Sequence, residues 1–85
     1  MKKAQRWNYA LRQYEPCEIP DGAVGYIEDL SQKIPCANCG KEIVAGDGYT
    51  SMCIHTMLGF GFIVCNDCYE KEWEERRKWE TKIGK

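Results

Sequence analysis

The spacing of apolar residues predicts a helix near the start of the chain. Four of them follow one another at intervals of three or four positions: Ala4, Trp7, Leu11 and Tyr14. This spacing places them on one face of an α-helix. A proline at position 16 predicts the end of the element, because the residue before a proline avoids the helical conformation. We therefore expect a helix over about residues 3–14.

Two further patterns predict a hairpin and a second helix in the C-terminal half. The runs YTSMCIHTM and FIVC are rich in β-branched and aromatic residues and are separated by LGFG, which indicates two strands joined by a turn. The segment NDCYEKEWEERRKWETKIG predicts a helix that Asn66 or Asp67 can cap, with acids early and bases later. Between the N-terminal helix and these elements, GYIEDLSQ fits either a short extended piece or a single helical turn.

Four of the six cysteines form two matching pairs, CANC and CNDC, at Cys36, Cys39, Cys65 and Cys68. Two such pairs supply the four sulfur ligands that a structural Zn²⁺ ion needs. A chain of 85 residues builds only a marginal core, so a metal staple is expected. The alternative is one or two disulfides. A redox pair would need a βαβ setting, which the pattern lacks.

The order of knuckle, hairpin and helix resembles the treble-clef group of zinc fingers. The sequence pattern CANC…VCNDC is similar to the C-x-N-C…C-N-x-C motif of the GATA-type finger, with Asn38 and Asn66 in the asparagine positions. The match covers residues 36–68 and the helix after them, with a longer spacer and without the Leu-Trp-Arg-Arg run of that family. The resemblance implies the fold of this segment and its four metal ligands.

These observations predict a small α+β domain stabilised by one structural zinc ion. Its elements would follow in the order N-terminal helix, zinc knuckle, β-hairpin and C-terminal helix, which is a treble-clef-like arrangement. Residues 1–33 would form the amphipathic helix and an acidic connector, and residues 34–85 the four-cysteine module. Both parts are expected to belong to one compact domain.

Three further residues offer soft metal ligands or a reactive thiol: Cys17, Cys53 and His55. Cys53 and His55 are two positions apart on a predicted strand and therefore share a face. A second closed zinc site needs four ligands, so we favour a buried Cys53 and a hydrogen-bonded His55. A nucleophilic pair is the least favoured alternative, because the pattern supplies no third orienting group.

The C-terminal helix carries the residues that we expect to contact a partner: Trp73, Arg76, Arg77 and Trp79. Tryptophan and arginine are enriched among the anchors of protein interfaces. The alternative is that the N-terminal helix covers one of the two tryptophans.

Charge is distributed unevenly although the formal net charge is −1. Residues 1–14 contain four bases and no acid, whereas residues 15–35 contain five acids and one base. Four zinc-bound thiolates would add two further negative charges, which disfavours non-specific binding to nucleic acid.

We therefore expect a non-enzymatic interaction module that binds another protein, such as a small regulatory protein of bacteria or phages. A nucleic-acid-binding zinc finger is the alternative function. The N-terminal residues MKKAQRWNYALRQYEP do not resemble a secretory signal, and no apolar run is long enough to span a membrane. A cytoplasmic location is expected, and no small-molecule substrate is evident.

Overall fold

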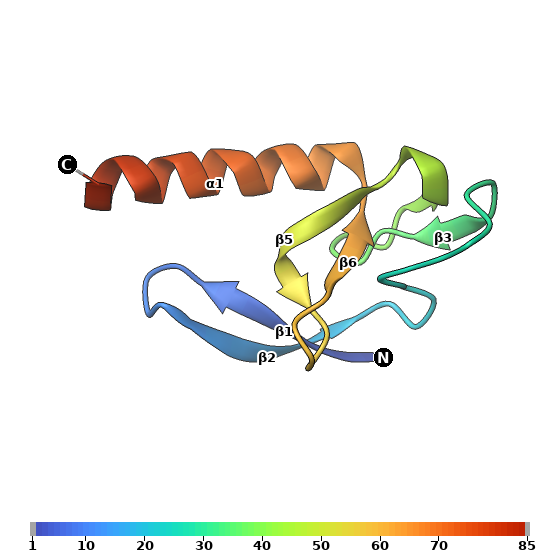
Figure 1. Ribbon diagram of the computed structural model, residues 1–85, viewed down its shortest axis with the longest axis horizontal. Helices are drawn as coiled ribbons and strands as arrows, with labels where there is room; N and C mark the ends of the chain where they lie inside the picture. The colour runs from blue at the N-terminus through green and yellow to red at the C-terminus, as the bar shows by residue number, and fades with distance from the viewer. Residues whose placement is uncertain (1, 85) are drawn as a thin grey trace.

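The computed structural model describes residues 2–84, with side-chain surroundings for residues 2–79. Within this range the chain is mostly β-structure, followed by one long helix (Figure 1). The strands are β1 (Lys2–Asn8), β2 (Gln13–Ile19), β3 (Lys33–Pro35), β4 (Glu42–Val44), β5 (Tyr49–His55) and β6 (Gly61–Val64). A short 3-10 helix, η1 (Ala45–Asp47), precedes β5, and α1 (Asn66–Gly84) ends the described chain.

The predicted N-terminal helix is wrong, and with it the helix-first fold class. Residues 2–19 form an antiparallel hairpin in which Ala4 pairs with Cys17 and Trp7 pairs with Tyr14. The helical spacing was misleading because the same apolar residues can meet across two strands, where tertiary pairing overrides local propensity. Leu11, which the helix would have buried, lies in the turn and is 59% exposed.

Side-chain and backbone hydrogen bonds close the turn of this hairpin. Asn8 accepts two of them. Its side-chain oxygen accepts from the Leu11 N–H at 3.1 Å, and its backbone carbonyl accepts from the Arg12 N–H at 2.7 Å. Arg12 takes a left-handed conformation with φ 55°. Pro16, which suggested a helix end, lies in β2 at the edge of the sheet, where a residue without an N–H is tolerated.

The main sheet joins the two halves of the sequence, since its strand order is β2-β1-β5-β6. β1 pairs with β5 through Gln5–His55 and Arg6–Ile54, and β5 pairs with β6. The second sheet contains only β3 and β4. The hairpin β5–β6 and the helix α1 are therefore present as the pattern in the C-terminal half predicts, but they are built onto an N-terminal β-hairpin.

A bulge in β5 connects the sheet to α1. The register shifts between Thr50 and His55, and the Ser51 hydroxyl accepts hydrogen bonds from the N–H groups of Cys53 (3.1 Å) and Ile54 (2.8 Å). Ser51 donates to a carboxylate oxygen of Glu72 at 2.5 Å, and the other oxygen accepts from the Met52 N–H at 2.8 Å. Glu72 is buried, so these bonds satisfy a carboxylate that would otherwise be costly to bury.

The core is small and includes metal-ligand candidates. Its largest fully buried residues are Ile19, Ile54, Val64 and Cys36, which come from four different segments of the chain. Phe62 and several alanines fill the space around them. Among the described residues, no helix combines the length and the apolar character needed to cross a membrane.

Candidate metal centre

Three short segments bring the four paired cysteines together. Cys36 and Cys39 lie in the tight turn between β3 and β4, Cys65 lies between β6 and α1, and Cys68 lies in the first turn of α1. Their sulfur atoms all lie within 4.8 Å of one another, and the Sγ atoms of Cys39 and Cys65 are 3.8 Å apart. Four sulfurs at this separation are able to share one metal ion.

Backbone amides in the knuckle point at the Cys36 sulfur. The N–H groups of Asn38 (3.3 Å), Cys39 (3.5 Å) and Cys65 (3.2 Å) donate to it. The turn closes through the Gly40 N–H, which donates to the Cys36 carbonyl at 3.0 Å. Gly40 has φ 81°, a conformation that a residue without a side chain adopts at little cost.

The four thiols differ in how readily they lose a proton. Burial raises the pKa of Cys36, but the three backbone amides outweigh it and lower that pKa to about 7. Burial and the neighbouring thiols raise the pKa of Cys68 to about 12. The Lys41 amide lowers the pKa of Cys39, whereas burial and the thiols of Cys36 and Cys65 raise it, with a net rise. A metal ion that binds here must therefore displace protons.

The donor set fits a closed structural site. Cys36, Cys65 and Cys68 are buried, and Cys39 is exposed. Four thiolates in a tetrahedron complete the coordination of Zn²⁺ and leave no position for a reacting water. The arrangement therefore suits a metal that holds chain segments together.

Among the described residues, these four cysteines are the one group of three or more metal-ligand side chains that lie close enough to share an ion. Cys17, Cys53 and His55 do not form a second such group. The Cys53 thiol lies 3.7 Å from the Tyr9 hydroxyl, and the His55 Nδ1 lies 2.8 Å from the Tyr14 hydroxyl. Cys17 packs against the core from the edge strand β2.

The residues expected to contact a partner lie in different environments along α1. Trp73 is half-buried, stands edge-on to Tyr69 and lies beneath the Arg76 guanidinium, 5.3 Å from ring centroid to Cζ. Trp79 donates from Nε1 to Glu75 at 2.7 Å and faces a cavity beside the β1–β2 hairpin. Arg77 is exposed.

The structure also gives roles to Asn38, which the sequence pattern offered only as a motif position, and to Glu72, which the pattern did not single out. Asn38 follows the first metal-ligand position and accepts a hydrogen bond from Arg6 at 2.8 Å, which links the knuckle to β1. Glu72 anchors the β5 bulge. The sequence does not indicate that Glu72 is buried, because it is one of several glutamates on the same helix.

The four clustered cysteines could bind a metal ion, and their arrangement is consistent with a zinc-finger-like site. Comparisons of the chain with protein-family models, with curated proteins and with solved structures found no match.

Proposed function

We propose that this protein is a non-catalytic interaction module that is held together by one structural Zn²⁺ ion and binds another protein. The observation that carries the metal assignment is the cluster of four sulfurs within 4.8 Å. The knuckle, hairpin and helix that hold the cluster support the resemblance to zinc fingers. Closed thiolate coordination supports a structural role for the ion.

Metal content tests the assignment directly. Protein purified without added chelator should contain one zinc per chain by elemental analysis. Cys65→Ser should lose the metal, whereas Cys53→Ser, which lies outside the cluster, should retain it. Two zinc ions per chain, or an unchanged zinc content in Cys65→Ser, would contradict the proposal.

An exposed apolar turn supports a protein partner. The β5–β6 turn exposes Met57 by 69%, Leu58 by 85% and Phe60 by 67%. The Thr56 side-chain oxygen accepts from the N–H groups of Leu58 (3.3 Å) and Phe60 (3.1 Å), and the Thr56 N–H donates to the Phe60 carbonyl at 2.7 Å. Gly59 has φ 98°. The turn therefore presents its apolar side chains from a pre-organised backbone, which lowers the entropy cost of binding.

A neighbouring segment extends this apolar surface. Gly25 approaches the Gly61 carbonyl so closely that a Cβ at Gly25 would lie 2.9 Å from its oxygen. Tyr26, the next residue, is 80% exposed. Exposed apolar groups gathered in this way mark interaction sites. We name Tyr26, Met57, Leu58 and Phe60 the apolar tip, and we expect it to enter an apolar pocket of a partner protein.

Charge favours a protein over an anionic surface as the occupant of the tip. The chain has a net charge of −1, and a four-thiolate zinc centre makes it more negative. Lys2, the first residue of β1, is held by a hydrogen bond within the chain, because its Nζ donates to the Ala23 carbonyl at 2.7 Å. An anionic bilayer would therefore gain little electrostatic attraction.

Crosslinking and binding measurements test the tip. A photo-crosslinking amino acid at position 58 should capture a protein in cells, and the purified protein should bind wild type. Leu58→Asp should weaken this binding at least tenfold. Leu30→Asp is the matched control, because Leu30 is also exposed (60%) but lies outside the tip. Equal losses in both variants, or binding of Leu58→Asp at full affinity, would contradict a role for the tip.

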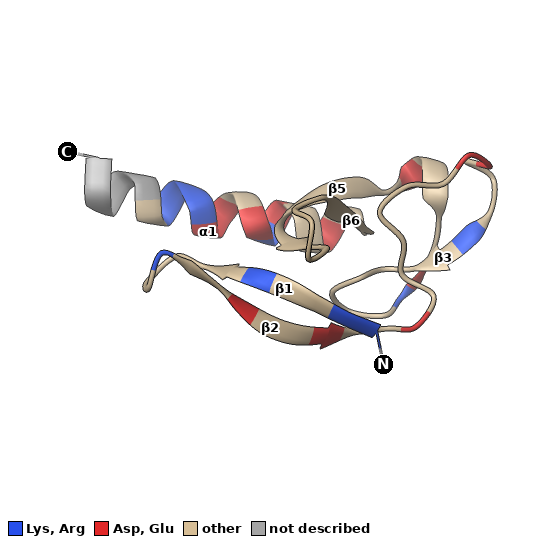
Figure 2. Cartoon of the chain, turned by 60° about the horizontal axis from the view of Figure 1, so that its bottom comes forward, with Lys and Arg blue, Asp and Glu red and all other residues tan. Residues whose placement is uncertain are grey.

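Nucleic-acid binding is the second candidate, and one observation favours it. Figure 2 shows that the basic turn between β1 and β2 lies at the same end of the molecule as the basic segment of α1. These residues are Arg12, Arg76, Arg77 and Lys78. If they bind phosphates, affinity for DNA or RNA should fall steeply with salt, and Arg12→Gln with Arg77→Gln should reduce that slope. Absence of binding at low salt would exclude this candidate.

A further inference from the structure

A cavity of about 380 Å³ separates the β1–β2 hairpin from α1. Figure 1 shows the hairpin turn below the C-terminal half of the helix, and residues from both elements line the space. The volume is near the lower end of the range for ligand sites. It is large enough for one long side chain.

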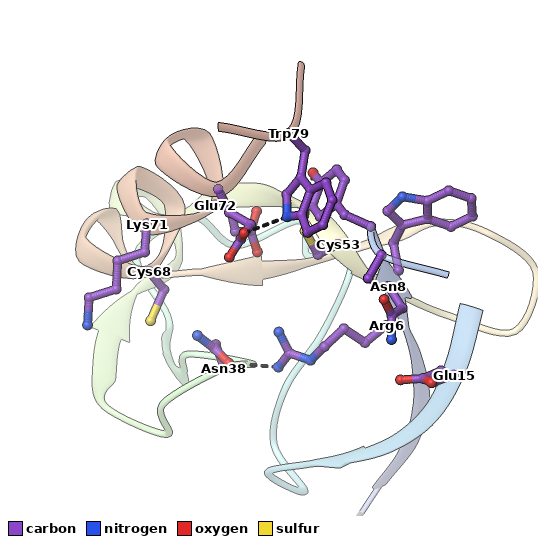
Figure 3. Close-up of a pocket in the computed structure, with 13 residues that line it drawn as sticks. Arg6, Asn8, Glu15, Asn38, Cys53, Cys68, Lys71, Glu72 and Trp79 are labelled. Carbon is purple, nitrogen blue, oxygen red and sulfur yellow. Dashed lines mark hydrogen bonds between the residues drawn. The ribbon is translucent and has the colours of Figure 1, made fainter. Parts of the chain in front are cut away.

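Aromatic rings and carboxylates line one end of the cavity. Trp7 and Tyr9 come from the hairpin, and Trp79 comes from the helix. Glu75 lies against Trp79, because one of its oxygens accepts the indole N–H at 2.7 Å. In Figure 3, Trp79 and Glu72 are both drawn above the Arg6 guanidinium. Rings attract a cation through their electron-rich faces, and a nearby carboxylate adds to that attraction.

The basic residues of the cavity lie at its other end, toward the metal centre. Figure 3 places Lys71 and the Arg6 guanidinium on the side of Cys68 and Asn38. Arg6 is already bonded to Asn38 at 2.8 Å. Four thiolates on one Zn²⁺ ion would place two negative charges beside these two cations. At the aromatic end, Arg76 lies near Trp7 and Tyr9, but its guanidinium stacks over the Trp73 ring outside the cavity.

The count of charged residues in the lining also favours a cationic ligand. Two cations and three carboxylates line the cavity, and the third carboxylate belongs to Glu15. Burial is the main cause that raises the pKa of the Cys53 thiol in the cavity wall; the charges of Glu72 and Glu75 also raise it, whereas the Tyr9 hydroxyl and the charge of Arg6 lower it. The lining thus has one more carboxylate than cation, and the Glu75 carboxylate lies against the Trp79 ring.

We infer that this cavity binds a cationic side chain, an ammonium or a guanidinium group, of the protein partner. The cation would lie among the rings of Trp7, Tyr9 and Trp79 and near the Glu75 carboxylate. This inference rests on the proposed function, because it assigns a chemistry to that partner. The apolar tip contributes no residue to the cavity. The role of the tip and the role of the cavity can therefore be tested separately.

Titration with short peptides tests the cavity alone. The probes are acetyl-Gly-Xaa-Gly-amide peptides in which Xaa is arginine, lysine, trimethyllysine or norleucine, added to zinc-loaded protein. The indole N–H signals of Trp7 and Trp79 should shift in proton–nitrogen NMR spectra, with dissociation constants on the order of 1 mM. Trp73 is the internal control, because it does not line the cavity. The three cationic probes separate a guanidinium from an ammonium site.

Two variants establish the source of the binding. Glu75→Gln retains an acceptor for Trp79 and removes the charge, so it should weaken the cationic peptides about fivefold. Trp79→Leu should weaken them about tenfold. Glu74→Gln, an exposed helix residue outside the cavity, should have no effect. Equal binding of the norleucine peptide, or no shift of Trp7 and Trp79 by any cationic peptide at millimolar concentration, would overturn the inference even if the tip variants behave as expected.

Discussion

The two ends of this molecule differ in how their side chains are arranged: one end holds the four paired cysteines, which we call the metal end. At the metal end, Cys36, Cys65 and Cys68 are themselves core residues, and the side chains around them are mostly small. At the other end, the β1–β2 turn and the second half of α1 enclose a cavity, and aromatic rings there are only half-buried. The cysteine cluster thus belongs to the apolar core, whereas the rings at the other end line a cavity.

This difference shows how a chain of 85 residues can afford an open surface. A domain of this size buries too little apolar area to be stable by a wide margin. A metal centre concentrates stability in a few residues, because the free energy of metal binding is free energy of folding. The β1–β2 hairpin and α1 could then carry half-buried rings, and the β5–β6 turn the apolar tip, without cores of their own.

The largest expected effect is the loss of the metal. Structural zinc contributes roughly 10–16 kcal/mol in small zinc-binding peptides, which is as large as the whole stability of a typical domain. Removal of zinc by a strong chelator, or the change Cys36→Ser, should therefore unfold the chain. The loss of near-ultraviolet circular dichroism and of dispersed NMR signals measures this.

Cys17→Ser is the control for that experiment, since Cys17 is half-buried in the edge strand. It should retain both the metal and the fold. If the chelated wild-type protein keeps its tertiary signals, the metal end does not depend on the ion and the contrast between the two ends fails.

Much of the metal end could be predicted from sequence, because paired cysteines encode a local geometry. Two residues between ligands and a glycine after Cys39 define the knuckle without reference to distant segments. The N-terminal hairpin could not be predicted in this way. Its residues are held by pairing of β1 with β5, whose partners Gln5 and His55 lie 50 positions apart, and a helical spacing of apolar residues fits both structures.

A smaller effect is expected from the connection between the two ends. Glu72→Ala should leave the Ser51 hydroxyl and the Met52 N–H without their partner inside the fold. An unsatisfied buried polar group costs about 1–3 kcal/mol, so denaturant unfolding should show a loss of this size while zinc remains bound. Glu74→Gln, which is exposed, should change the free energy of unfolding by less than about 0.5 kcal/mol. A loss of zinc from Glu72→Ala would show that the connection and the metal centre are not separable.

The same comparison explains why the proposed binding surfaces were harder to predict than the cysteine cluster. Trp79 was identified from its residue type, but its neighbours Trp7 and Tyr9 belong to the hairpin that the sequence pattern assigned to a helix. The apolar tip was interpreted only as the turn LGFG. A turn sequence indicates where the chain reverses, and it does not indicate whether the side chains of that turn are covered.

The smallest effect concerns thiol chemistry and leaves the stability unchanged. In zinc-loaded protein, iodoacetamide should modify the half-buried Cys17 first and Cys53 much more slowly, because Cys53 is buried against Tyr9. Burial also raises the pKa of Cys53 above the usual 9.0, so its thiolate is scarce at neutral pH and its modification rate should still be rising above pH 9. Mass spectrometry of digested protein measures both rates. Glu72→Ala should increase the modification rate of Cys53 and leave that of Cys17 unchanged, since the substitution loosens the bulged segment that contains Cys53. Equal rates for the two thiols in wild type would show that the wall of the cavity opens as readily as the sheet edge.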